Sequence, residues 1–359
     1  MTSRYARLWF IAGLLLALSV CCQAYAGSVW VEEEWHHLSE TMDVGGVPFV
    51  VDADILALPT DAAARAYSVV SLSADAMRQK AQALDWAKLG CDMRSVTWYD
   101  DVGTRGFYSN DDDIGCSGCI GLTGDIDISC CPQYSLYVNI SDGYEDFDNN
   151  YEPLGTLSYQ AMADYAQRVA ETCGYQLGQP VRAQRYTDIN GICEGFQKAN
   201  SSVSKEDAAG YRFITLYYPP YFQGLRLFSG IMPGAREGMQ VLSGWLKLTI
   251  SEKHGIVLLQ GPLLDAAQFS PLGEPQPVLT AQQMLQRVQQ QFLGSMKGIT
   301  QTKISRMAME YVPVAPFCDT VQQYTLYPAW VLTVTHTYDS GRELTMTRIF
   351  DALTGNPIV

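Results

Sequence analysis

The sequence predicts an α+β protein built from repeated units in which one helix packs on a curved antiparallel sheet. Three patterns suggestive of helices recur along the chain, and each accompanies segments in which apolar and polar residues alternate with the period of a strand. Hydrophobic residues make up 47% of the 359 residues and charged residues 17%. This composition is typical of a globular protein and excludes a disordered one. The repetition is one of pattern, because no fixed sequence period is present.

The chain is acidic, with 38 aspartate and glutamate residues against 24 lysine and arginine residues and a formal net charge of -14. A surface of this sign repels phosphate backbones, which argues against nucleic acid as a partner. After residue 26 no apolar run approaches the roughly 20 residues that a membrane-spanning helix needs. Nucleic-acid-binding proteins and proteins with internal membrane helices are therefore not expected.

Residues 1–26 have the layout of a secretory signal peptide. Arg4 and Arg7 precede an apolar run over residues 8–20, and Ala24 and Ala26 offer small residues at the −3 and −1 positions of a signal-peptidase cut before Gly27. This predicts a secreted or cell-surface protein.

Lipidation at Cys21 is the alternative to simple secretion. The lipoprotein pathway requires a small residue before the cysteine, whereas Val20 is branched, so cleavage after Ala26 is favoured. Contact with a membrane is expected only through a lipid anchor at Cys21. Residues 27–45, which include the pair His36-His37 after three glutamates, are expected to be a leader.

The cysteines outside the signal are predicted to form disulfides. An even number of cysteines in an exported chain favours disulfides over metal ligands or redox catalysis, and eight cysteines allow 105 pairings. The disulfide candidates are Cys91, Cys116, Cys119, Cys130, Cys131, Cys173, Cys193 and Cys318.

One of these cysteine groups resembles a redox or zinc motif. The run from Cys116 to Cys119 is a CxxC, but its surrounding glycines oppose the helix that a thioredoxin-type site needs. A zinc ribbon requires a second CxxC, and the nearest candidate is the adjacent pair Cys130-Cys131. Structural disulfides are therefore favoured over zinc.

An α+β domain is predicted over residues 46–261, with a disulfide-stapled acidic insertion at residues 100–152. The insertion holds twelve acidic residues, one basic residue, seven glycines and four cysteines, which predicts a loop-rich segment. Strands at 125–129 and 136–140 are expected to cross it. The other elements expected in this domain are strands at 47–55, 67–72, 211–218, 241–250 and 256–260 and helices after Ser73 and over 158–173.

A linker is predicted over residues 262–277, which contain four prolines. A second α+β domain, residues 278–359, follows it. Thr280 and Gln283 form a capping box at the start of its helix. Strands at 302–311, 324–338 and 343–350 make an antiparallel meander.

The C-terminal domain resembles the PepSY and YycI-like domains of exported bacterial proteins. The matching features are the capped helix from Thr280, the Tyr327–Trp330 entry into a strand, and the closing residues 349–355. This resemblance implies a PepSY- or cystatin-like fold for the repeated unit. PepSY-like domains are similar to inhibitory or regulatory modules of secreted peptidases and sensor kinases, which implies a peptidase or sensor as partner.

Over residues 47–359 the chain resembles an uncharacterised family of exported lipoproteins from clostridial gut bacteria. The features that carry this resemblance are the 51–54 strand, the helix that ends at Cys173-Gly174 and the 210–213 strand, in that order before the PepSY-like tail. The weak lipobox and the acidic insertion depart from the family's outline. The resemblance implies neither catalytic residues nor a cofactor.

Calcium is the one metal for which the sequence offers a candidate site. Asp146, Asp148, Asn150 and Glu152 alternate as oxygen donors, but Tyr151 and Leu157 stand where an EF-hand needs glycine and glutamate. Weak extracellular calcium binding and a solvated acidic turn both remain open.

Neither the histidines nor the tyrosines define a site. His336 alternates with apolar residues on a strand and is expected to be structural, and no metalloprotease spacing occurs. The aromatic run 217–222 fits a recognition surface for peptide or glycan and, equally, a strand end packed on the sheet.

The sequence leads to three alternative hypotheses about function. The first is a non-catalytic binding or regulatory protein of the cell envelope with a protein or peptide partner. The second is an extracellular hydrolase with a carboxylate pair, which two carboxylates converging in a cleft would favour. The third is a structural envelope protein whose acidic insertion holds calcium.

Overall fold

The computed structural model describes two β-sheets with few helices. Within the described residues, strands far outnumber the four helices, so the prediction of repeated helix-on-sheet α+β units is wrong. The strands of each sheet come from distant parts of the chain and do not divide into local units. The described residues are 30–31, 33–58, 62–70, 75–76, 79, 83, 96–101, 104–109, 116–121, 125–130, 145–147, 159–186, 188–198, 203–210, 212–229, 238–242, 244–251, 255–262, 268–293, 297–316 and 323–358.

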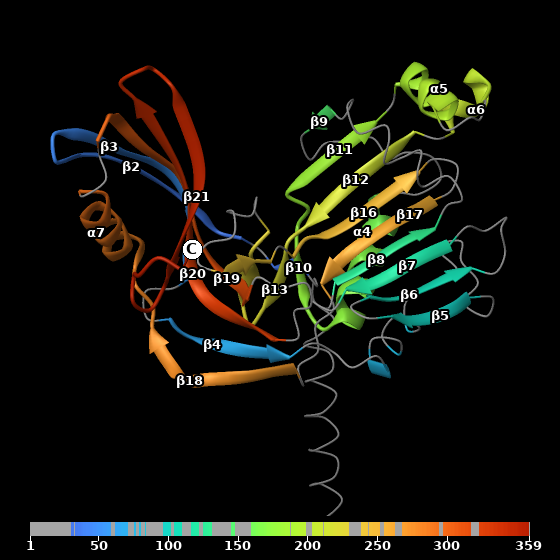
Figure 1. Ribbon diagram of the computed structural model, residues 1–359, viewed down its shortest axis with the longest axis horizontal. Coiled ribbons are helices and arrows are strands. Elements are labelled where there is room, and N and C mark those ends of the chain that lie inside the picture. The colour runs from blue at the N-terminus through green and yellow to red at the C-terminus, as the bar shows by residue number, and fades with distance from the viewer. Residues whose placement is uncertain are drawn as a thin grey trace, which may run out of the picture.

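Sheet A, the larger sheet, is mixed and curled (Figure 1). Its described strands are β1 (Trp30–Val31), β2 (Trp35–Val44), β3 (Val47–Leu56), β4 (Ala63–Val70), β10 (Gln176–Gly178), β13 (Pro220–Phe222), β14 (Leu225–Leu227), β15 (Met239–Val241), β18 (Phe269–Pro277), β19 (Ile299–Pro316), β20 (Gln323–Tyr338) and β21 (Glu343–Asp351). The order is β1-β10-β13-β14-β19-β20-β4-β18, with β3 and β15 also on β19, β2 on β3 and β21 on β20.

The hairpin of β19 and β20 is the spine of sheet A. Its pairing runs from Ile299 opposite Tyr338 to Val314 opposite Thr325. Each of the two strands pairs with different strands along its length. β19 pairs first with β3 and then with β14 and β15, and β20 pairs with β4 at one end and with β21 at the other. Register shifts in β19 add twist, which lets such long strands curl around a core.

Sheet B is antiparallel throughout. Its strands are β5 (Val96–Asp101), β6 (Thr104–Ser109), β7 (Cys116–Gly121), β8 (Asp125–Cys130), β9 (Glu145–Phe147), β11 (Arg182–Tyr186), β12 (Phe213–Tyr218), β16 (Leu246–Ser251) and β17 (Gly255–Pro262), in the order β5-β6-β7-β8-β17-β16-β12-β11-β9. The expected acidic insertion thus supplies a meander of strands to this sheet. The expected strand at 125–129 is confirmed as β8, and residues 136–140 lie outside the described residues.

Two helices lie where the sequence predicts them. They are α4 (Tyr159–Cys173), which ends before Gly174 at a φ of 81°, and α7 (Ala281–Phe292), which begins with the predicted capping box at Thr280. Phe292 of α7 lies 6.2 Å from Phe49 between ring centroids, which anchors the helix on sheet A. The other described helices are α5 (Ile189–Lys198) and α6 (Lys205–Ala209). None of the described helices is both long and apolar enough to cross a bilayer.

The segment predicted as a linker, residues 262–277, contains strand structure. Residue 262 ends β17, and residues 269–277 form β18, which pairs with β4 at the edge of sheet A. An edge strand tolerates proline because one side of its backbone needs no ladder partner. Sheet A takes strands from both sides of this segment, so the expected division into 46–261 and 278–359 does not follow the sheets.

Candidate functional site

A cavity of about 790 Å³ lies where the chain passes between the two sheets. Its wall includes the connection from β10 to β11 and the residues just before β16. The volume falls in the range typical of small-molecule and peptide sites. The charged and aromatic residues that line it are Glu33, Trp35, Arg226, Trp245, Arg306 and Glu310.

Strand register brings the two central charges of the cavity together. β14 runs parallel to β19 with Arg226 in register with Glu310. Arg306 lies four residues before Glu310 on β19, and its Nη2 donates to Glu310 Oε1 at 2.7 Å. Glu33 comes from the N-terminal part of the described chain. β1 pairs in parallel with β10, and Glu33 lies between β1 and β2.

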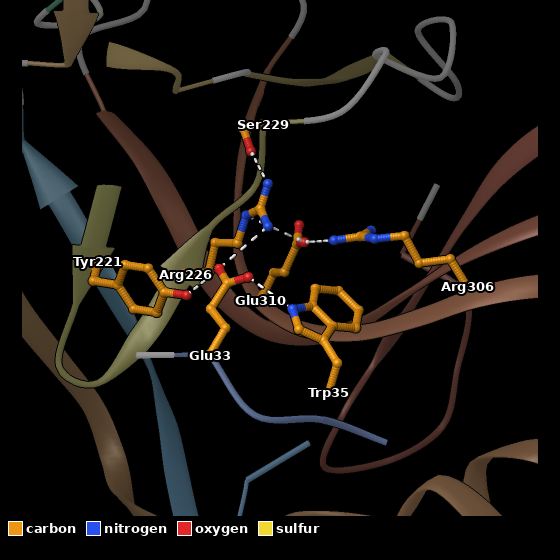
Figure 2. A network of polar contacts seen from close by, with 7 residues as sticks. All are labelled: Glu33, Trp35, Tyr221, Arg226, Ser229, Arg306 and Glu310. Carbon is orange, nitrogen blue, oxygen red and sulfur yellow. Dashed lines mark hydrogen bonds and ion pairs between the residues drawn. The ribbon is translucent and has the colours of Figure 1, made fainter. Parts of the chain in front are cut away.

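The carboxylate of Glu33 accepts hydrogen bonds from three side chains (Figure 2). The hydroxyl of Tyr221 and Nη1 of Arg226 both donate to Oε1, the latter at 3.3 Å. The indole Nε1 of Trp35 donates to Oε2 at 2.8 Å. Burial, and then the bond to Glu33, raise the pKa of the Tyr221 phenol above its ordinary value, so Tyr221 is a neutral donor here. These three groups form a carboxylate-recognition site.

The ion pair between Arg226 and Glu310 is buried but incompletely bonded. Their side chains are 7% and 2% exposed, and Arg226 Nε lies 3.8 Å from Glu310 Oε1, which is too far for a hydrogen bond. Arg226 Nη2 donates instead to Ser229 Oγ at 3.3 Å. Among the described residues, Arg226 Nε and Glu310 Oε2 have no hydrogen-bond partner. Leaving such atoms unpaired is costly, so this network is not at its best geometry.

Both arginines also lie against tryptophans. The guanidinium of Arg226 is 5.3 Å from the ring centroid of Trp245, and that of Arg306 is 5.2 Å from the ring of Trp35. Such cation–π contacts hold the guanidinium planes in place without using their hydrogen-bond donors. The arrangement is suited to binding a ligand that has a carboxylate and some apolar surface.

Few of the residues singled out in the sequence fall in this site. Asp146 lies in β9 opposite Gln184, whereas Asp148, Asn150 and Glu152 lie outside the described residues. No group of three or more potential metal ligands occurs within the described part of the chain. Calcium binding by the insertion therefore stays a prediction.

The disulfides also stay a prediction. Cys193, half-buried on α5, forms no disulfide with any residue that the structure describes. The side chains of the other candidates lie outside the description: Cys91, Cys116, Cys119, Cys130, Cys131, Cys173 and Cys318.

The histidines belong to the sheets. His36 and His37 lie in β2, so residues 35–44 of the expected leader are a strand of sheet A. The structural role predicted for His336 is confirmed, since it is 3% exposed and its Nδ1 lies 2.9 Å from Thr302 Oγ1.

The aromatic run divides between the two interpretations. Tyr218 and Phe222 are buried, and the Phe222 ring stacks on Phe269 at 4.1 Å between centroids, as expected of a strand packed on the sheet. Tyr221 is buried too, but its hydroxyl donates to Glu33, and the residue lines a neighbouring cavity of about 160 Å³.

Sequence reasoning missed the principal residues of the site, although two of them carried a signal. Arg226 is the one charge in the apolar run Leu225–Phe228, and Glu310 stands alone among apolar neighbours at 307–314. A lone charge in a buried strand requires a partner, which is a signal of a polar network. Glu33 lay within a run of three glutamates and gave no such signal.

No family model matches the sequence, and no curated protein matches it. Among solved structures, the crystal structure of an uncharacterized protein from Eubacterium rectale is similar to this chain, with a TM-score of 0.58 and 14% sequence identity over 89% of this chain and 93% of that chain. At this identity the likeness shows a shared fold alone.

Proposed function

We propose that this chain is a secreted or cell-surface binding and regulatory protein, without catalysis of its own, whose protein or peptide partner docks at the cavity around Arg226. The single observation that carries the proposal is the convergence of three donors on one carboxylate beside a cavity of about 790 Å³. The sequence resemblance of residues 278–359 to PepSY-like domains is the reason for naming a peptidase or a sensor domain as the partner.

The lining chemistry supports recognition. Arginine, tryptophan and tyrosine are the residues that dominate binding energy at protein interfaces, because they combine large contact area with directed donors. Arg306 and Trp245 extend this character beyond the immediate contacts of Glu33. Their half-buried side chains would be covered by a docked partner.

Capture experiments test the proposal. The mature chain, the Trp245→Ala and Arg306→Ala variants, and a Leu344→Ser control on β21 would be used as baits against secreted and envelope proteins of the source cells. A partner of this site is retained by the wild type and the control and lost by both cavity variants. A partner retained by all four chains, or no retained protein, would contradict the proposal.

A hydrolase is the second candidate, because Glu33 and Glu310 line one cavity. Arg226 lies between these carboxylates and forms ion pairs with both, at 3.3 Å and 3.8 Å. Glycoside hydrolysis needs one carboxyl to donate a proton, whereas here each carboxylate is paired with a cation. Glycosidase activity that disappears in both Glu33→Gln and Glu310→Gln chains would establish this candidate instead.

A further inference from the structure

The segment that delivers Glu33 pairs with the edge of sheet A through β1, its short described strand. β1 comprises two residues, Trp30 and Val31, paired in parallel with Leu177 and Gly178 at the outer edge of β10. The segment then reaches Glu33 and enters β2 at Trp35. A two-residue strand at a sheet edge has little pairing energy, and edge strands are the usual sites at which a segment of another protein adds to a sheet.

Glu33 is bound in the manner of a ligand. Its side chain is 13% exposed and accepts hydrogen bonds from two residues distant in sequence, Tyr221 and Arg226, and from Trp35, two residues along the chain. It also lines both the 790 Å³ cavity and a neighbouring cavity of about 160 Å³. Glu33 thus lies between two cavities, at a position where a side chain of another protein could reach the same hydrogen-bond donors.

The bonding of Arg226 lowers the cost of releasing Glu33 from this position. While Arg226 Nη1 serves Glu33, its Nε stays 3.8 Å from Glu310 Oε1, and Glu310 Oε2 has no partner within the described residues. When the Glu33 carboxylate withdraws, Arg226 can turn towards Glu310 and satisfy these atoms. The gain offsets part of the cost of displacing Glu33, since a fully bonded buried pair is more stable than a partly bonded one.

We propose that the edge of β10 together with Arg226, Tyr221 and Trp35 is a docking groove for an extended peptide segment that carries an acidic side chain, and that Trp30, Val31 and Glu33 occupy this groove as an internal competitor. The inference rests on the proposed function and specifies its partner: an acidic strand from another protein, added to the edge of sheet A with its carboxylate at Arg226. The partner binds only the fraction of molecules in which the internal segment has left the docking groove.

A synthetic peptide with the sequence of residues 28–36 is the probe, and isothermal calorimetry with the mature chain is the measurement. Glu33→Ala removes the competing carboxylate, and the isosteric Glu33→Gln repeats the test with less disturbance of packing. Glu34→Ala is the matched control, because Glu34 is 88% exposed and adjacent in sequence. Circular dichroism verifies that each chain is folded.

Both Glu33 variants are expected to bind the peptide about tenfold more tightly than the wild type and the Glu34→Ala control, because internal competition reduces the competent fraction. A peptide with Glu33→Gln should lose about tenfold in affinity, since it lacks the charge that Arg226 recognises. Equal affinity of all chains, or no binding by folded Glu33 variants, would overturn the inference. In that case, loss of a captured partner in both Trp245→Ala and Arg306→Ala would still uphold the proposed function, so the two failures are distinguishable.

Discussion

Arg226 is the residue on which the candidate site depends. Its guanidinium is buried among Glu33, Glu310 and Ser229, and it contacts the Trp245 ring. A buried cation of this kind stabilises a fold less by its own attraction than by preventing buried carboxylates from being left unpaired.

Replacement of this arginine with an apolar residue should therefore be severe. Arg226→Met leaves Glu33 without its cation and Glu310 with Arg306 alone, and we expect a loss of about 3–5 kcal/mol in the free energy of unfolding. Urea denaturation measures it. The Glu33→Gln/Arg226→Met double variant should recover part of the loss. A single-variant cost below about 1 kcal/mol would mean that Arg226 is not the buried partner of these carboxylates.

A second cluster of charges, on the exposed face of sheet A, should make stability depend on pH. His37 Nε2 lies 3.2 Å from Asp52 and its Nδ1 3.0 Å from Asp54. The hydrogen bond to Asp54, with the charges of both aspartates, raises the pKa of His37 above its ordinary 6.5. The stabilisation of the fold by protonated His37 is fully present below pH 6.5 and is lost as the pH rises through the raised pKa.

Asp52 acts in the opposite direction. The hydrogen bond and charge of Lys303 lower the pKa of Asp52 below its ordinary 3.8, so its contribution is present above pH 3.8 and is lost as the pH falls through the lowered pKa. The cluster is thus most stabilising between these two ordinary values. Because these side chains are exposed, the effect is small. The melting temperature of the His37→Gln variant should fall furthest below the wild type near about pH 5 and approach it above about pH 8. A gap that stays constant with pH would contradict the assignment.

At this scale the sequence predicted little of the site. His336 could be identified as structural because its strand neighbours are apolar, whereas the burial of Glu33 is set by Arg226, 193 residues away. No local pattern encodes such a pairing. The lone charges of β14 and β19 show only that partners must exist, without naming them.

At the scale of elements, local signals predicted structure well where local interactions decide it. The cap of α7 is the clearest instance: Thr280 Oγ1 accepts from Gln283 N at 3.3 Å, and Gln283 Oε1 accepts from Thr280 N at 2.9 Å. β18 is the contrary instance. Its prolines indicated a linker, but its place at the edge of sheet A depends on β4, some two hundred residues earlier in the chain, which no local window contains.

The cap provides a prediction for α7. Thr280→Ala removes the side-chain acceptor at the helix start and should lower the free energy of unfolding by about 1 kcal/mol in urea denaturation. Gln282→Ala, on the exposed side of the first turn, is the control and should change stability by less than about 0.5 kcal/mol. Equal effects of the two substitutions would show that the capping box contributes nothing measurable.

Across the whole molecule, two sheets are assembled from strands that alternate between them along the chain. The connections from β10 to β11 and from β12 to β13 each cross between the sheets, and the first of them lines the cavity. The cavity is therefore lined by strands of sheet A and by connections between the two sheets. A fold class derived from local helix and strand patterns misses this, because sheet membership is decided by long-range pairing.

The register of sheet B narrows the disulfide prediction. β7 and β8 pair with Cys116 directly opposite Cys130. Directly opposed residues of an antiparallel pair have Cα atoms about 4.5–5.5 Å apart, within the span of a disulfide. Mass spectrometry of a non-reducing digest of the purified chain should recover a Cys116–Cys130 linked peptide. Recovery of Cys116 linked to another cysteine would contradict this register.

Hydrogen–deuterium exchange tests the central claim, that the junction around Arg226 is where a partner docks, most directly. The Glu33→Ala chain would be compared with and without the peptide of residues 28–36. We expect slower amide exchange in β10 and β14 when the peptide is present, because a strand is added and Arg226 becomes enclosed. Protection confined to other strands, with β10 and β14 unchanged, would contradict it.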